Sequence, residues 1–163
     1  MVKRVFFSFH YSNDAWRAGQ VRNIGMVDGN RVASDNDWEQ IKRGGDQAIT
    51  RWISNQMHGK SCVVVLIGAE TAGRKWINYE ILEGWNSGKG LLGVRIDRLQ
   101  DRYGYQSYPG NNPFSEFNVR GVPLDRIVPV LDPGNVDSRT AYSRISANIA
   151  AWIDHAVAIR SKY

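Results

Sequence analysis

A glutamate that follows a buried strand is the first candidate for chemistry in this sequence. Residues 63–68 form an unbroken apolar run that ends in glycine, and a polar turn leads from it into a helical pattern over 75–85 that contains Glu80. Strands that are apolar on both faces belong to parallel sheets, whose ligands bind outside the carboxyl ends of the strands. A carboxylate held at that edge can stabilise positive charge in a transition state. The alternative is an ordinary solvated carboxylate on a helix.

Two further residues of this segment belong to the same expected site. Trp76 precedes Glu80 by four residues, so both side chains fall on one face of the helix. Gly68 ends the strand at the edge where a ligand is expected. We predict that both contribute to binding, with packing between helix and sheet as the competing role for Trp76.

Polar residues also follow the first apolar run of the chain. Residues 5–9 predict a strand, and Ser8, His10 and Tyr11 stand at its carboxyl end, before a helix expected over 13–23. Because parallel strands end at a common edge of the sheet, we expect these three side chains near Glu80. The alternative is a polar strand exit whose residues serve the helix start.

The remaining pattern alternates strands and helices. It predicts a short strand at 31–34, helices before and after the glycine pair at 44–45, a strand at 91–96, an edge strand from 122–124 and 127–131, and a last helix after Asp137. Alternation of this kind indicates an α/β fold of flavodoxin-like type, a parallel sheet of about five strands with helices on both faces. We expect one domain over 1–163.

A long irregular stretch at 98–121 follows the fourth strand of this pattern. It contains three tyrosines and Asn112 before a proline, which restricts Asn112 to an extended conformation. A loop this long and aromatic is typical of a functional segment, and it leaves the sheet at the expected site. We therefore predict that Asn112 contacts a ligand, with the capping of a turn as the alternative.

Composition narrows the function classes. The single cysteine excludes an internal disulfide, the three histidines are too dispersed for a metal set, and the apolar runs are too short for a membrane span. The start of the chain has no signal-peptide pattern, so we expect a cytoplasmic protein. A net charge of +5 without a dense basic block gives no support for nucleic-acid binding.

Three stretches resemble the TIR-like domain family, in its bacterial and archaeal branch that serves Thoeris antiphage defence. They are residues 4–11, residues 64–68 with the W-x-x-x-E helix from Trp76 to Glu80, and the Asn112-Pro113-Phe114 motif. The resemblance extends over most of the chain, except that residues 27–37 do not align.

The resemblance implies an enzyme that cleaves NAD at its nicotinamide–ribose bond and forms a cyclic ADP-ribose signal. It implies that Glu80 is catalytic, that Phe6 and Ser8 line the ribose pocket and that Asn112 lies near the active site. NAD is the substrate, and no separate cofactor is implied. The expected partners are a second copy of the chain and an effector reached through the diffusible product.

Two other functions remain open from the sequence. A TIR-like domain can act as an interaction module without chemistry, and Glu80 and Trp76 would then serve packing alone. A nucleoside deoxyribosyltransferase-like enzyme shares the general plan and a catalytic carboxylate. Release of nicotinamide from NAD separates the first alternative from an NAD-cleaving enzyme, and release of adenine from a deoxynucleoside would support the second.

Overall fold

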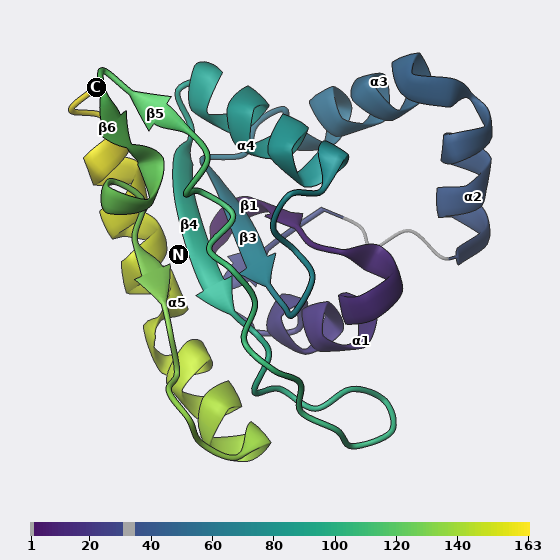
Figure 1. The fold of residues 1–163 in the computed structure, drawn as a ribbon, viewed down its shortest axis with the longest axis vertical. Helices are drawn as coiled ribbons and strands as arrows, with labels where there is room; N and C mark the ends of the chain where they lie inside the picture. The colour runs from purple at the N-terminus through teal and green to yellow at the C-terminus, as the bar shows by residue number, and fades with distance from the viewer. Residues whose placement is uncertain (1, 31–34) are drawn as a thin grey trace.

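The computed structural model describes residues 2–30 and 35–163, and a five-stranded parallel sheet forms its centre (Figure 1). The strand order is β2-β1-β3-β4-β7. The three inner strands are β1 (Lys3–Ser8), β3 (Cys62–Ile67) and β4 (Gly90–Arg95), and the edges are β2 (Val27–Asp28) and β7 (Val130–Leu131). The fold class expected from the sequence is confirmed.

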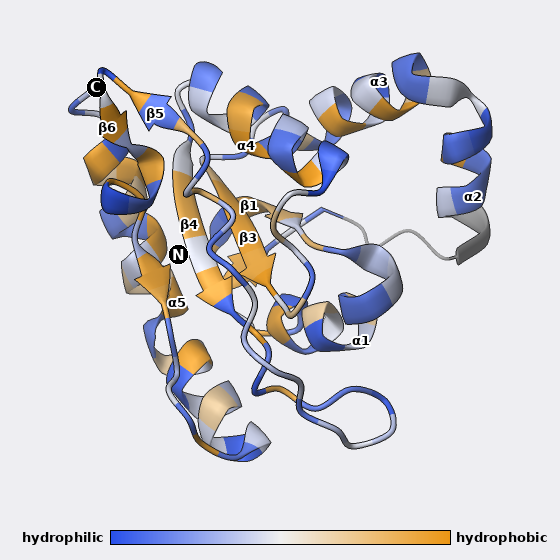
Figure 2. Ribbon diagram, viewed as in Figure 1, coloured by the Kyte–Doolittle hydropathy of each residue, from blue (hydrophilic) through white to orange (hydrophobic). Residues whose placement is uncertain are grey.

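The described residues form five α-helices. They are α1 (Tyr11–Arg22), α2 (Asp35–Arg43), α3 (Gly45–Met57), α4 (Lys75–Asn86) and α5 (Ser138–Arg160). Helices α1, α3, α4 and α5 cover the two faces of the sheet, while α2 packs on α3. Side chains of β3 alternate between the two cores, so Val64 packs with α1 and α5 while Val65 packs with α3 and α4. Figure 2 shows this apolar centre with polar residues on the outer helix surfaces.

The ends of the helices follow partly from their capping residues. Asp137 is the N-cap of α5 and accepts a 2.7 Å hydrogen bond from the backbone N–H of Thr140, as the sequence predicts. Helix α1 begins at Tyr11, two residues earlier than expected, with His10 at its N-cap. Ser12 and Asn13, residue types that often cap a helix, therefore lie inside the first turn, and the polar strand exit is shorter than the sequence suggests.

Two segments expected as strands from the sequence have a different outcome. Residues 31–34, expected to form a strand, lie outside the described residues. Val122–Pro123 is β6 of a separate antiparallel hairpin with β5 (Asn118–Val119), so its assignment to the last sheet strand was wrong. The turn of this hairpin is Arg120-Gly121, where both residues have positive φ values of 52° and 79°. A short 3₁₀ helix, Leu124–Arg126, then leads towards β7.

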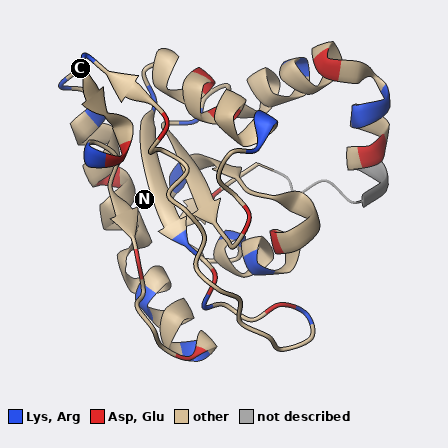
Figure 3. Cartoon of the chain, in the orientation of Figure 1, with Lys and Arg blue, Asp and Glu red and all other residues tan. Residues whose placement is uncertain are grey.

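The connection over 98–121 is a packed part of the fold. Leu99 and Phe114 are fully buried, and Ser107 donates its backbone N–H to the Asp97 carbonyl at 2.8 Å. No helix among the described residues has the length and hydropathy needed to cross a membrane. Basic and acidic residues are interspersed over the helices and loops (Figure 3).

Candidate active site

Glu80 lies buried where helix α4 passes the carboxyl end of β1. Its neighbours Ile77 and Ile81 pack into the core, and this anchors the helix face and turns Glu80 toward the strand end. The Ser8 hydroxyl donates a 2.8 Å hydrogen bond to Oε1 of Glu80, and the two residues are 1% and 8% exposed. The structure thus brings together two residues that the sequence predicts for one site.

Burial decides the charge of Glu80. Removal from water raises the pKa of its carboxyl to about 8, and the hydrogen bond from Ser8 opposes part of this rise. The group is therefore mostly protonated at neutral pH when the site is empty. A positive charge placed beside it would lower the pKa again and favour the carboxylate.

Glu80 forms part of the wall of a cleft of about 1400 Å³, large enough for a dinucleotide. The cleft runs between the end of β1, the start of α4 and the arm made by α2 and α3 (Figure 1). Its lining combines aromatic rings with charged side chains. The residues are Phe6, Phe7, Phe9, His10, Tyr11, Ser12, Asn30, Trp38, Glu39, Lys42, Ile49, Trp52, Ile53, Glu70, Ala72, Gly73, Arg74, Lys75, Trp76, Ile77 and Glu80.

Phe6, His10 and Tyr11 all line this cleft together with Glu80. The pKa of His10 is lowered, first by burial and then by the positive charge of Arg74, which keeps the ring neutral at pH 7. Its Nε2 lies 3.0 Å from the Ser12 hydroxyl, while its buried Nδ1 has no hydrogen-bond partner within the described chain. The ring is therefore placed at the cleft with one nitrogen unused.

Trp76 stands at the entrance to the cleft on α4 and is half-buried. Its ring meets Tyr79 edge to face at 5.8 Å between centroids, and the Lys75 ammonium lies 4.9 Å from its centre. A side chain fully committed to the core would be covered on all sides. Trp76 is thus both a partial packing residue and a cleft wall.

Gly68 does not line the cleft. A side chain at this position would collide with the carboxylate of Asp14, and the backbone of Gly110 packs directly against the Gly68 carbonyl. The residue therefore allows the loop, α1 and the end of β3 to approach one another closely. Its place in the fold supports a structural role at the edge of the site.

Asn112 lies in a neighbouring hollow of about 300 Å³ that shares Ala72 and Gly73 with the cleft. Its side-chain oxygen accepts a 2.8 Å hydrogen bond from the backbone N–H of Phe114. This is the local geometry of a capped turn. The structure thus places Asn112 beside the main cleft, with its side-chain oxygen already engaged.

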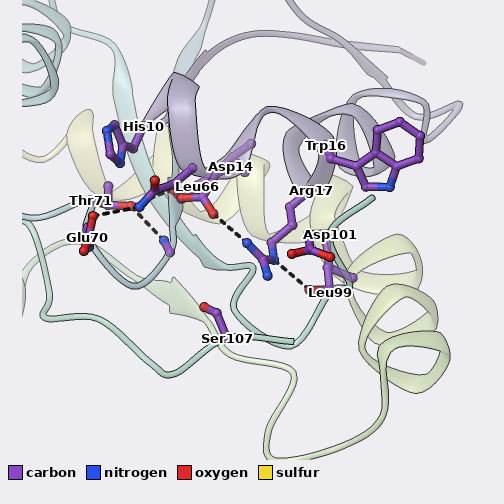
Figure 4. Close-up of polar contacts among 12 residues, drawn as sticks. His10, Asp14, Trp16, Arg17, Leu66, Glu70, Thr71, Leu99, Asp101 and Ser107 are labelled. Atoms are coloured by element: carbon purple, nitrogen blue, oxygen red, sulfur yellow. Dashed lines mark hydrogen bonds and ion pairs between the residues drawn. The ribbon is translucent and has the colours of Figure 1, made fainter. Parts of the chain in front are cut away.

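Asp14 and Arg17 of α1 form a buried ion pair that the sequence did not predict (Figure 4). Hydrogen bonds from Arg17 also join α1 to the long loop over 98–121. Arg17 contacts the Asp14 carboxylate at 3.2 Å and donates to the carbonyls of Leu99 and Tyr105 at 2.8 and 2.9 Å. Burial raises the pKa of Asp14, an effect that Arg17 opposes. An i,i+3 pair on a helix is a weak sequence signal, and nothing local indicates that the loop would supply its partners.

The aromatic side of the cleft was also missed. Trp38 on α2 and Trp52 on α3 contribute rings to it, and Asn30 contributes a buried amide that accepts the N–H of Phe7 at 2.7 Å. The inward direction of Trp52 follows from the apolar stripe of α3. Such a stripe does not show whether an aromatic ring is fully buried in the core or lines a cleft. Trp38 comes directly after the segment that could not be aligned with a family pattern.

The parallel α/β sheet and the buried glutamate at its strand ends agree with the TIR-like domain that the sequence resembles. The family model described as Thoeris protein ThsB, TIR-like domain, matches residues 6–101, a span that includes Ser8 and Glu80. The chain belongs to this family.

The chain is also similar to a protein of Bacillus cereus (strain MSX-D12) that bears the name "Putative cyclic ADP-D-ribose synthase ThsB1". The two are 37% identical over 119 residues. The aligned part covers 70% of this chain and 62% of the relative, so the chain spans less than two thirds of the relative's length.

Proposed function

We propose that this chain cleaves NAD at the nicotinamide–ribose bond and converts the remainder into a cyclic ADP-ribose-type signal for antiphage defence. The observation that carries the proposal is the buried Glu80 carboxyl, which lines a cleft of dinucleotide size and accepts a hydrogen bond from Ser8. The name of the Bacillus cereus relative supports the same reaction class. A signal of this kind would reach an effector by diffusion, without a contact between the two proteins.

The chemistry suits a single carboxylate. Nicotinamide leaves a pyridinium as a neutral base and needs no general acid, unlike the leaving group of an O-glycoside. The developing charge on the ribose is positive, and the Glu80 carboxylate stabilises it at short range in a site with little water. The positive charge of the bound pyridinium also lowers the pKa of Glu80 from its value of about 8, so the substrate favours the ionised group that it needs.

The reaction balances without an oxidant or a second substrate. The bond between the ribose anomeric carbon and nicotinamide breaks, and its electron pair leaves with nicotinamide. A lone pair from adenine or from a hydroxyl of the adenosine half forms the new bond to that carbon, and one proton is released. Water at the same carbon would give linear ADP-ribose, so the ratio of products depends on which nucleophile the cleft presents.

Incubation of the purified chain with NAD tests the proposal, with nicotinamide and the ADP-ribose products separated by chromatography. Glu80→Gln should lower nicotinamide release about 100-fold or more. Glu83→Gln is the matched control, because Glu83 lies on the same helix outside the cleft and should leave the rate unchanged. Equal rates for the parent and Glu80→Gln would remove Glu80 from the mechanism.

The assay is run over a range of protein concentration. A requirement for self-association then appears as a specific activity that rises with concentration. Absence of nicotinamide release throughout that range would favour an interaction module. Release of adenine from a deoxynucleoside, with NAD left intact, would instead favour a deoxyribosyltransferase-like enzyme.

A further inference from the structure

A chain of aromatic rings lines one side of the cleft. The centroid of Phe6 lies 6.5 Å from that of Trp52, Trp52 lies 6.0 Å from Trp38, Trp38 lies 6.2 Å from Tyr11, and Tyr11 lies 6.1 Å from Phe9. These five residues come from β1, the segment that follows it, and helices α1, α2 and α3. Packing of the helices against the sheet brings the rings together. The sequence pattern of any one segment does not indicate this cluster.

The rings begin beside the reactive group and lead away from it. Phe6 is fully buried and stands two residues before Ser8, so both point from the same face of β1 toward the Glu80 side of the sheet. Trp38 lies two rings further on, on α2, which α3 holds away from the sheet (Figure 1). A planar ligand at Trp38 would thus lie in the same cleft as Glu80, against a different helix.

Partial exposure separates these rings from an ordinary core. Phe9, Tyr11, Trp38 and Trp52 are all half-buried and line the cleft, whereas core residues of α1 and α3 such as Val21 and Ile53 are closed off from solvent. Half-covered aromatic faces at a cleft are suited to stacking on a flat heterocycle, and a base stacked on an aromatic ring is held by about 1–3 kcal/mol.

A cation accompanies the rings on helix α2. Lys42 follows Trp38 by four residues, so both side chains lie on one face of that helix, and both line the cleft. Its ammonium pairs with Glu39 at 3.2 Å, and both side chains are about half exposed at 46% and 59%. An exposed pair of this kind contributes little and can exchange its partner for a phosphate.

We infer that the surface formed by Trp38 and Tyr11 binds the adenine ring of the substrate, with Lys42 facing the phosphates. The inference rests on the proposed function and adds a second anchoring point to it. With nicotinamide riboside at Glu80 and adenine at Trp38, the dinucleotide is folded inside one cleft. The adenosine half then lies near the anomeric carbon, and it competes there with water.

Calorimetric titration with AMP tests the adenine surface without any turnover. The parent and Glu80→Gln should bind AMP equally, Trp38→Ala should bind it about fivefold or more weakly, and Trp38→Phe should retain most of the affinity. Trp16→Ala is the matched control, because Trp16 is an exposed tryptophan on α1 outside the cleft. Nicotinamide mononucleotide, which lacks adenine, should bind the parent, Trp38→Ala, Trp38→Phe and Trp16→Ala alike.

Product analysis provides the second readout. Trp38→Ala should lower the ratio of cyclic to linear ADP-ribose while nicotinamide is still released, and Trp38→Phe should restore the ratio. Folding of each variant is checked by its thermal melting.

Unchanged AMP affinity in a folded Trp38→Ala protein would overturn the inference, even if NAD is cleaved. Conversely, Trp38-dependent AMP binding in a protein that leaves NAD intact would contradict the proposed reaction and leave the adenine surface standing. The two hypotheses therefore fail in different experiments.

Discussion

The Ser8 hydroxyl and the Glu80 carboxyl, 72 residues apart in the chain, meet through a 2.8 Å hydrogen bond. The bond joins the end of strand β1 to helix α4 and lies beside the cleft. It is also the contact that limits the rise in the Glu80 pKa caused by burial. The protonation state of Glu80 therefore affects both the stability of the folded protein and the chemistry proposed for the site.

Glu80→Gln should stabilise the protein increasingly as the pH rises. The pKa of Glu80 is about 8 in the folded protein, against an ordinary value of 4.5. Between these pH values the unfolded chain has released a proton that the folded chain retains. The unfolding free energy of the parent therefore falls by at most about 1.4 kcal/mol for each pH unit. Thermal melting from pH 4.5 to pH 8 measures the difference, and parallel curves for the parent and the variant would contradict it.

Ser8→Ala should move the activity profile to higher pH. Loss of the hydroxyl removes the bond that lowers the Glu80 pKa, so ionisation needs a higher pH, by about one pH unit. The rising limb of kcat/KM for NAD should shift accordingly, whereas Ser61→Ala, an exposed serine outside the cleft, should leave the profile in place. A lower rate without any shift would indicate that Ser8 acts by contact alone.

Trp76→Ala should cost activity more than stability. The ring is half-buried, so we expect a loss of about 1–2 kcal/mol in unfolding free energy instead of the roughly 3–5 kcal/mol typical of a buried aromatic. Loss of the cleft wall should lower kcat/KM about tenfold. Trp85→Ala provides the comparison, because Trp85 packs against Arg160 and Tyr163 away from the cleft. A large drop in Tm with unchanged kinetics would assign Trp76 to packing.

Asn112→Ala distinguishes a turn cap from a ligand contact. Removal of the hydrogen bond to the Phe114 N–H should cost about 1 kcal/mol of stability. The capped turn leads us to expect an unchanged product ratio, with Asn111→Ala, an exposed neighbour in the same hollow, as control. A shift in the ratio of cyclic to linear product would instead support the contact predicted from the sequence.

Arg17→Met should destabilise the fold by about 3 kcal/mol, because it leaves the Asp14 carboxyl buried without its cation. It also removes two hydrogen bonds to the long loop, to Leu99 and Tyr105. Denaturant unfolding measures the cost, and limited proteolysis shows whether the loop is released. The double variant Asp14→Asn/Arg17→Met should recover part of the stability, and strictly additive losses would exclude the coupling.

The inner strands and their helices were predictable because burial on both faces leaves a plain signal. The run at 63–68 is apolar throughout because β3 packs on two helical layers. Recognition of this strand led to the prediction that Glu80, on the following helix, lies near a strand end. The convergence of Ser8 with Glu80 followed from one rule, that parallel strands end at a common edge. These parts of the fold and site depend on local pattern and chain order.

What the sequence did not show depends on contacts between distant segments. Arg17 finds its partners in carbonyl groups more than eighty residues away, and carbonyl groups have no sequence signature. The ring of Trp38 lines the cleft only because α3 packs on β1 and α2 packs on α3. The hairpin at Arg120-Gly121 depends on positive φ at an arginine, which composition alone does not reveal.

The two edges of the sheet, β2 and β7, pair through only two residues each. Edges this short offer few unpaired backbone groups, so among the described residues neither provides a template on which another chain could add a strand. An assembly of this protein that avoids these two edges would form through helix or loop surfaces, whose side chains set its geometry. Such an interface can separate again, whereas a sheet extended from chain to chain tends to become a fibre.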